Sequence, residues 1–360
     1  MDRKYYYTLL KNELKMPIAA DLTLHKEKNP EKVILDGISL GKVIEKTALK
    51  YKTPLAIPLM DLKIEKNAIL SLFNVMENNS DNYHFKDGEP NDNDYKKYTE
   101  KVNDIFTPRM KATCDAINYI SENTDFLPIG MCIGPFSLMT KLISDPITAV
   151  YLYGTGIKIE VDPVIFTLKR ALDISTIFIK NYILKQINAG AKAMVVCEPA
   201  ANKIYISPMQ IKSKPELWNE IIIKYNLEVA NFLKQNDCDL IFHNCGELTN
   251  EMLASFNQLD PVILSLGSSR VLWKDADIIS KDIILFGNLP TKHFYSDEIT
   301  PKDKIKKMTN ELITKMKEKN HPFILGSECD ILSVNVYNSK IEEKIDTFLN
   351  CCCLEETALK

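Results

Sequence analysis

Short apolar segments recur along the chain, and amphipathic stretches separate them. Eight of these segments have the length and the continuous apolar character of a buried strand. They are Pro17–Asp21, Pro54–Asp61, Phe126–Ile133, Ala191–Glu198, Asp239–Phe242, Val262–Leu266, Ile283–Asn288 and Phe323–Gly326. Strands that are apolar throughout are covered on both faces, which is typical of a parallel sheet with helices around it.

The regular alternation of strand and helix signals predicts a barrel. Helix-like segments such as Leu217–Gln235 and Lys302–Lys319 lie between the apolar segments. Eight strand–helix units in 360 residues, 45% of them hydrophobic, suit an α/β fold of the TIM (β/α)8 type. We therefore expect residues 1–360 to form one TIM-barrel domain with an N-terminal helical extension. A doubly wound parallel sheet is the structural alternative.

Charge and hydropathy exclude several classes of partner. The net charge of −3 gives no basic surface for nucleic acid. No apolar run reaches the ~20 residues that cross a bilayer, and the first residues lack an apolar secretory core. We expect a cytoplasmic protein that binds neither nucleic acid nor membrane. Its nine irregularly spaced cysteines suit reduced thiols or metal ligands better than a disulfide framework.

Polar side chains follow the predicted strands where each strand ends. They are Asp61, Glu198, His243, Cys245, Ser265, Asn288 and Cys329. The active sites of TIM barrels lie at the carboxyl ends of the strands, so these side chains are expected to share one face of the barrel. This face therefore holds the candidate functional site.

Three of these residues have the chemistry of a zinc site. His243 and Cys245 are separated by one residue after the fifth predicted strand, so both point to the same side of an extended segment. Cys329 follows the eighth strand. One imidazole and two thiolates suit a catalytic zinc ion with one open position. A buried structural histidine is the alternative for His243.

The other strand-end residues are weaker candidates. Alternation along the fourth strand turns either Cys197 or Glu198 away from the barrel mouth, and we expect the Glu198 carboxylate to face inward. There it would be a fourth zinc ligand, a proton acceptor or a substrate anchor, or it would form a salt bridge within the barrel. Asp61 and Asn288 are expected either to contact the cofactor or to cap the helices that follow them. Cys351–Cys353 are expected to be packing residues or exposed thiols near the C-terminus.

A resemblance to a known family is carried by Leu59–Leu62, Ile133–Phe136, Leu240–Gly246, Gly287–Asn288 and Phe323–Ile331. These segments resemble the uroporphyrinogen decarboxylase superfamily, and within it the cobalamin-linked branch typified by methylcobamide:coenzyme M methyltransferases. The resemblance implies a TIM barrel with Zn²⁺ held by His243, Cys245 and Cys329. It also implies methyl transfer that involves a corrinoid carried by a partner protein.

The expected activity is therefore zinc-dependent methyl transfer between a corrinoid protein and a small thiol or methylated donor. The arginine-rich segment of the decarboxylases is absent from Ala19–His25, which disfavours decarboxylation. The remaining alternatives are a metal-independent decarboxylase of the superfamily and a non-catalytic, zinc-stabilised partner of a corrinoid protein. Ser327 and Glu328 precede Cys329 where many members of the branch have glycine before the cysteine, so the sequence does not identify a thiol as the acceptor. A second subgroup takes methyl groups from small donors and loads a corrinoid protein, and the sequence leaves the direction of transfer open.

Overall fold

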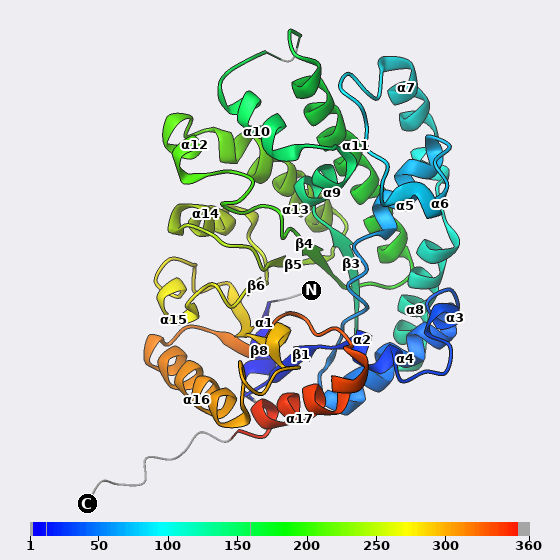
Figure 1. The fold of residues 1–360 in the computed structure, drawn as a ribbon. Coiled ribbons are helices and arrows are strands. Elements are labelled where there is room, and N and C mark those ends of the chain that lie inside the picture. The colour runs from blue at the N-terminus through cyan, green and yellow to red at the C-terminus, as the bar shows by residue number, and fades with distance from the viewer. Residues whose placement is uncertain (1–2, 12, 159, 352–360) are drawn as a thin grey trace, which may run out of the picture.

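Eight parallel strands form one curled sheet at the centre of the molecule. The computed structural model describes residues 3–11, 13–158 and 160–351, and Figure 1 shows the helices surrounding the strands. The strands are β1 (Lys15–Ile18), β2 (Leu55–Ala56), β3 (Leu127–Ile133), β4 (Ala193–Cys197), β5 (Asp239–Asn244), β6 (Ile263–Leu266), β7 (Ile284–Leu289) and β8 (Phe323–Asp330).

The strand order identifies a TIM-like α/β barrel. Hydrogen bonds join the strands in the order β1-β8-β7-β6-β5-β4-β3-β2. Neighbours from β2 to β8 are therefore consecutive in sequence, and β8 returns to β1. The doubly wound alternative is wrong. In such a sheet the strand order reverses at a switch point, whereas here it runs in one direction from β8 to β2.

Helices follow the strands and cover the outer face of the sheet. The longer helices are α4 (Gly37–Tyr51), α5 (Ile64–Leu72), α7 (Asp92–Lys101), α8 (Pro108–Asn123), α9 (Pro135–Leu142), α10 (Pro146–Gly154), α11 (Pro163–Asn188), α13 (Lys224–Gln235), α16 (Lys302–Lys319) and α17 (Asn338–Leu349). The shorter helices are α1 (Lys4–Leu10), α2 (Ala20–Leu24), α3 (Pro30–Val33), α6 (Glu77–Ser80), α12 (Pro208–Ser213), α14 (Asn250–Ser255) and α15 (Leu272–Asp275). Single turns are η1 (Val102–Asp104), the π-helical η2 (Asn219–Ile223), η3 (Phe256–Leu259), η4 (Thr291–His293) and η5 (Asn335–Tyr337).

Local sequence explains where the helices begin. Asp162 accepts hydrogen bonds from the amides of Val164 and Ile165, and Pro163 occupies the first turn of α11, so the start of this helix is both capped and preorganised. Thr107 and Pro108 start α8 in the same way.

The core has an inner and an outer part. Apolar residues such as Ile129, Val195 and Ile241 fill the barrel interior, and Tyr6 of α1 packs against this cluster. The Tyr6 hydroxyl donates to Asp239, the first residue of β5, at 2.8 Å. The helix α1 therefore closes the amino-terminal end of the barrel and leaves the carboxyl end for the site. A larger apolar cluster lies between the sheet and the helices.

All eight predicted strands are present, with different bounds at β1, β2 and β8. The first begins and ends earlier than the predicted Pro17–Asp21, because Ala20 already belongs to α2. The predicted segment Pro54–Asp61 contains only two strand residues, while β8 continues past Gly326 to Asp330. Between Met16 and Ile18 the pairing of β1 advances from Gly326 to Asp330, which is a local bulge in β8. No helix in the described residues is long and apolar enough to cross a membrane.

Candidate metal centre

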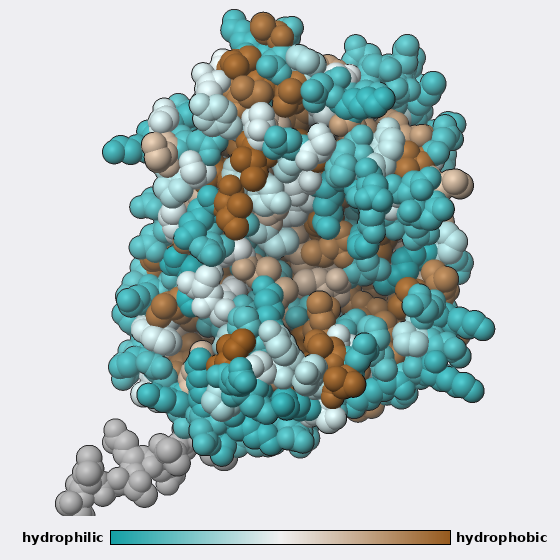
Figure 2. Space-filling view, in the orientation of Figure 1, coloured by the Kyte–Doolittle hydropathy of each residue, from teal (hydrophilic) through white to brown (hydrophobic). Residues whose placement is uncertain are grey.

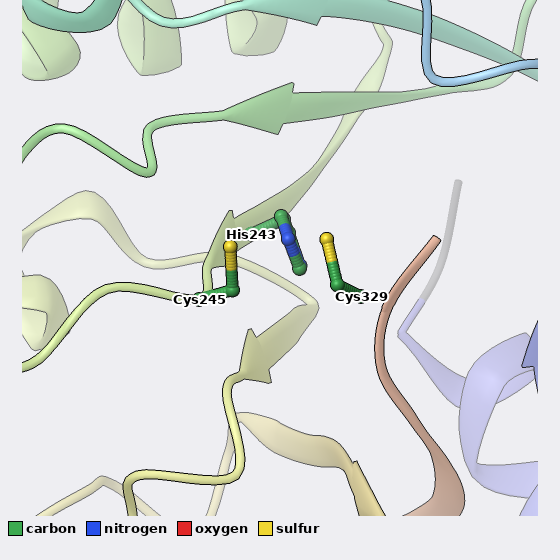
Figure 3. Close-up of side chains that lie close together, drawn as sticks. All are labelled: His243, Cys245 and Cys329. Atoms are coloured by element: carbon green, nitrogen blue, oxygen red, sulfur yellow. The ribbon is translucent and has the colours of Figure 1, made fainter. Parts of the chain in front are cut away.

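Three side chains meet at the carboxyl ends of β5 and β8. One ligand atom from each of His243, Cys245 and Cys329 lies within 4.8 Å of the others. In Figure 3 the His243 ring lies between the two cysteine side chains. The residues predicted from the sequence as metal ligands are therefore brought together, at a spacing that matches three ligands of one ion.

The His243 ring is oriented for ligation. Its Nδ1 atom lies 2.8 Å from the Ser265 hydroxyl of β6. Its Nε2 atom is buried and has no hydrogen-bond partner in the part of the chain that the structure describes. A buried imidazole nitrogen without a partner is costly unless it binds something. A hydrogen bond on one ring nitrogen commonly orients a histidine whose other nitrogen binds metal, so this arrangement fits a zinc ligand. One imidazole and two thiols are also a donor set that zinc accepts.

The two thiols sit in different surroundings. The Cys329 thiol, the neighbouring His243 and the Lys292 ammonium lower the pKa of Cys245, although burial opposes the shift. Contact with Cys245 and burial raise the pKa of Cys329. The Cys329 Sγ atom also lies 3.9 Å from the Met60 thioether. One thiol of the pair is thus already close to the anionic state that binds metal.

The bulge in β8 determines where Cys329 points. The hydroxyl of Ser327 accepts a hydrogen bond from the Ile18 amide at 3.0 Å, so a side chain replaces a backbone acceptor at this point of the ladder. Bulges of this kind redirect side chains next to functional sites. Simple alternation along β8 is interrupted before Cys329, and the sequence contains no evident signal for this change.

A cavity of about 730 Å³ opens beside Cys329. Its walls combine apolar side chains with lysines and two carboxylates. They are Met60, Asp61, Leu62, Lys63, Lys141, Thr291, Lys292, Tyr295, Cys329, Asp330, Leu332, Val334, Tyr337 and Ile341. Figure 2 shows apolar side chains around a hollow at the centre of the molecular face. The size suits a small-molecule site.

Asp61 lies at this cavity, in the segment that follows β2 and not at the end of the strand itself. Its carboxylate accepts from the Arg109 guanidinium at 3.0 Å, which ties it to α8. Asn288 lies elsewhere. Its side-chain nitrogen donates to the carbonyls of Gly267 and Arg270, both at 2.8 Å, and so holds the segment that follows β6. Contact of either residue with a cofactor stays a prediction.

The predicted orientation of Glu198 is wrong. The inward-facing residue at the end of β4 is Cys197, which packs in the barrel interior. The Glu198 carboxylate instead accepts from the amides of Phe136 and Ser137, at 3.2 and 2.6 Å, and from Asn226 of α13 at 3.0 Å. It caps the start of α9 among the surrounding helices, where a carboxylate satisfies the free amides of the first turn.

One further residue, Lys292, belongs to the site. Lys292 of η4 lines the cavity beside the thiols, and the sequence reading missed it because a proline turn separates it from β7. A lysine shortly after a strand end was the available signal.

Cys351 lies away from the metal centre, with its Sγ 3.0 Å from Asn310, while Cys352 and Cys353 lie outside the described residues.

Fold and site together define a parallel α/β barrel with a candidate His–Cys–Cys metal centre at its carboxyl end. The sequence profile of the uroporphyrinogen decarboxylase (URO-D) family matches residues 88–347. The chain therefore belongs to the uroporphyrinogen decarboxylase family.

The fold is also similar to that of a methyltransferase from Methanosarcina mazei, with a TM-score of 0.63 and 17% sequence identity. The similarity covers 93% of this chain and 92% of the other. No curated protein matches the chain in sequence.

Proposed function

We propose that the protein is a zinc-dependent methyltransferase. It would move a methyl group between a corrinoid (cobalamin) carried by a partner protein and a small thiol or methylated donor. The observation that carries the proposal is the buried, unpartnered Nε2 atom of His243, grouped with two thiols beside a cavity. The structural similarity to a methyltransferase supports the same class of reaction.

His243, Cys245 and Cys329 would hold the zinc ion, with Ser265 keeping the imidazole in place. A bound zinc ion would supply Lewis-acid activation of the substrate sulfur or oxygen. Three protein ligands leave one position for that substrate, whereas a structural zinc site is normally closed by four. The cavity then positions the small substrate next to the ligand set.

The protein's own residues also set the polarity of the cavity. Asp61 is held by Arg109 on one side, and exposed apolar residues such as Leu332 and Val336 lie on the segment after β8. Apolar walls exclude water around a reacting methyl group, and exposed apolar side chains near a cavity favour association with a partner.

The segment 19–25 contains no arginine, so a decarboxylase that holds a polycarboxylate there is less well supported.

Metal analysis tests the ligand assignment directly. Protein purified without chelator should contain about one zinc ion per chain, and Cys245→Ser or Cys329→Ser should remove most of it, because each substitution deletes one of three ligands. Cys351→Ser is the matched control and should leave the zinc content unchanged. Substoichiometric zinc that neither ligand substitution alters would contradict the assignment.

A kinetic assay then tests the reaction. Methylcobalamin serves as the methyl donor for a panel of small thiols, and loss of its visible absorption reports transfer. The reverse direction uses reduced cobalamin with methylated donors. Transfer should depend on zinc and disappear in Cys245→Ser. Zinc that binds fully without transfer in either direction would favour the non-catalytic alternative.

A further inference from the structure

The cavity contains basic groups that the proposed reaction leaves without a role. Three lysines line it: Lys63, Lys141 and Lys292. The Lys63 ammonium is paired with Asp81 at 2.9 Å. Within the residues that the structure describes, no ion pair joins Lys141 or Lys292 to a carboxylate. A cavity wall with unpaired ammonium groups favours a ligand that carries negative charge.

Lys292 is the lysine that the fold fixes beside the thiols. Its backbone amide donates to the Glu328 carboxylate at 3.2 Å, and Glu328 directly precedes Cys329. Glu328 is buried and also accepts from the hydroxyl of Ser268 at 2.6 Å and from its amide at 3.3 Å. One carboxylate thus joins the segments that follow β6 and β7 to the end of β8, and it places Lys292 next to the candidate ligands.

The charges around Lys292 agree with this position. Loss of surrounding water acts to lower the pKa of Lys292, but Cys245, Cys329 and Glu328 raise it overall above its ordinary value. The Lys292 ammonium contributes to the lowered pKa of Cys245 and opposes the rise in the pKa of Cys329. The Glu328 charge is shared among three hydrogen-bond donors, and Asp61 is paired with Arg109. Lys292 is therefore a positive charge in the same cavity wall as Cys329, and no ion pair neutralises it among the described residues.

Charge balance gives this lysine a function. A neutral imidazole and two thiolates cancel the charge of a divalent zinc ion. An anion that completed the set would leave an excess of one negative charge, which a nearby ammonium stabilises. We propose that Lys292 selects the charge of the ligand that completes the metal centre and favours an anion, a thiolate above all, over a neutral ether or water. This inference rests on the proposed function and adds a specificity-determining residue to it.

Ligand binding to the cobalt-substituted protein tests the inference without a turnover assay. The probes are 2-mercaptoethanol, whose thiol is its ionisable group, and a neutral methyl thioether. Binding is followed by the visible absorption of cobalt. Lys292→Met should weaken binding of the thiol by about tenfold, equivalent to one unit in the pKa of the bound thiol, and should leave thioether binding unchanged. Lys292→Arg keeps the charge and should restore most of the affinity.

The outcomes separate the two proposals. Wild-type protein that binds no cobalt contradicts the metal centre itself. Cobalt binding with equal thiol affinity in wild type and Lys292→Met leaves the centre standing and refutes the role of Lys292. Lys141→Met removes the other unpaired lysine of the cavity, and a loss equal to that of Lys292→Met would show that general charge, not the position of Lys292, governs binding. Lys292→Gln provides a second neutral variant if the Met variant folds poorly by circular dichroism.

Discussion

Glu198 shows how a single carboxylate can stabilise a barrel. It is fully buried, and its oxygens satisfy two amides at the start of α9 together with Asn226. Glu198→Ala removes these acceptors and leaves buried donors unpaired, so we expect the free energy of unfolding to fall by about 2–4 kcal/mol. Urea denaturation measures the change. Exposed Glu216→Ala is the control and should stay within about 0.5 kcal/mol of wild type.

Zinc content distinguishes this role from catalysis at the metal. Glu198→Ala should keep the zinc content of the parent, because its carboxylate faces the helices and not the ligand set. Unchanged stability combined with loss of metal would overturn this interpretation.

Glu65 of α5 makes stability depend on pH. Burial raises its pKa from 4.5 to about 7. One oxygen accepts from the Ile133 amide, and the other has no partner in the described part of the chain. A raised pKa in the folded state favours the protonated form, so wild type loses stability as the pH rises from 4.5 to about 7.

Glu65→Gln does not titrate and should escape this loss. Its unfolding free energy relative to wild type should rise by roughly 1.4 kcal/mol per pH unit within that window and level off above it. Urea titrations at a series of pH values measure the difference. Two parallel stability curves would show that Glu65 keeps an ordinary pKa.

The sequence identified His243, Cys245 and Cys329 because ligand chemistry and strand ends coincide there. It could not decide between Cys197 and Glu198. Alternation along a strand is informative when one face is apolar and the other polar, but both faces of a barrel strand are covered here. The Glu198 carboxylate accepts hydrogen bonds from the amides of α9, outside the sheet. The pattern of residue types along β4 contains no information about these partners.

At the scale of the element, the bulge in β8 connects stability to the metal centre. The Ser327 hydroxyl accepts from the buried amide of Ile18, and Cys329 lies two residues further along the strand. Ser327→Ala leaves that amide without its acceptor, so we expect a loss of about 1–3 kcal/mol in unfolding free energy. Cys329 should also be less well positioned, with zinc affinity about tenfold lower.

Urea denaturation and competition with a chromogenic chelator measure these two effects. The exposed Ser213→Ala is the matched control and should change neither. Loss of stability with full zinc affinity would mean that the bulge and the position of Cys329 are independent.

The apolar segments of the sequence predicted where the strands lie, but they did not predict how long each strand is. The polar residues Ser327–Asp330 resemble a loop in sequence, yet they extend β8 because pairing with β1 and contacts with the neighbouring segments hold them. Conversely, the apolar segment after Ala56 leaves the sheet, and Pro58 lacks the amide that a ladder requires. Tertiary pairing, and not local composition, sets these ends.

At the scale of the whole molecule, the fold should stand without metal. The three candidate ligands lie at strand ends, whereas the apolar clusters inside and outside the sheet are continuous without them. Chelation should therefore preserve far-ultraviolet circular dichroism and abolish methyl transfer. Bound metal should add about 4 kcal/mol at a thousandfold excess over its Kd, and re-added zinc should restore activity. Cooperative unfolding caused by chelation alone would identify a structural metal.

The open junction between the first two strands has a consequence for how such a barrel can diversify. Backbone pairing runs from β1 the long way round to β2 and does not join these two strands in the described residues. The residues after β2, including Met60 and Asp61, form a cavity wall next to this junction, whereas β5 and β8 are linked rigidly through β6 and β7. Side chains of this wall can therefore change in size without breaking a strand pair, which would adapt the entrance to substrates of different bulk. Met60 is the exception, because it contacts Cys329 and its size also affects the ligand set.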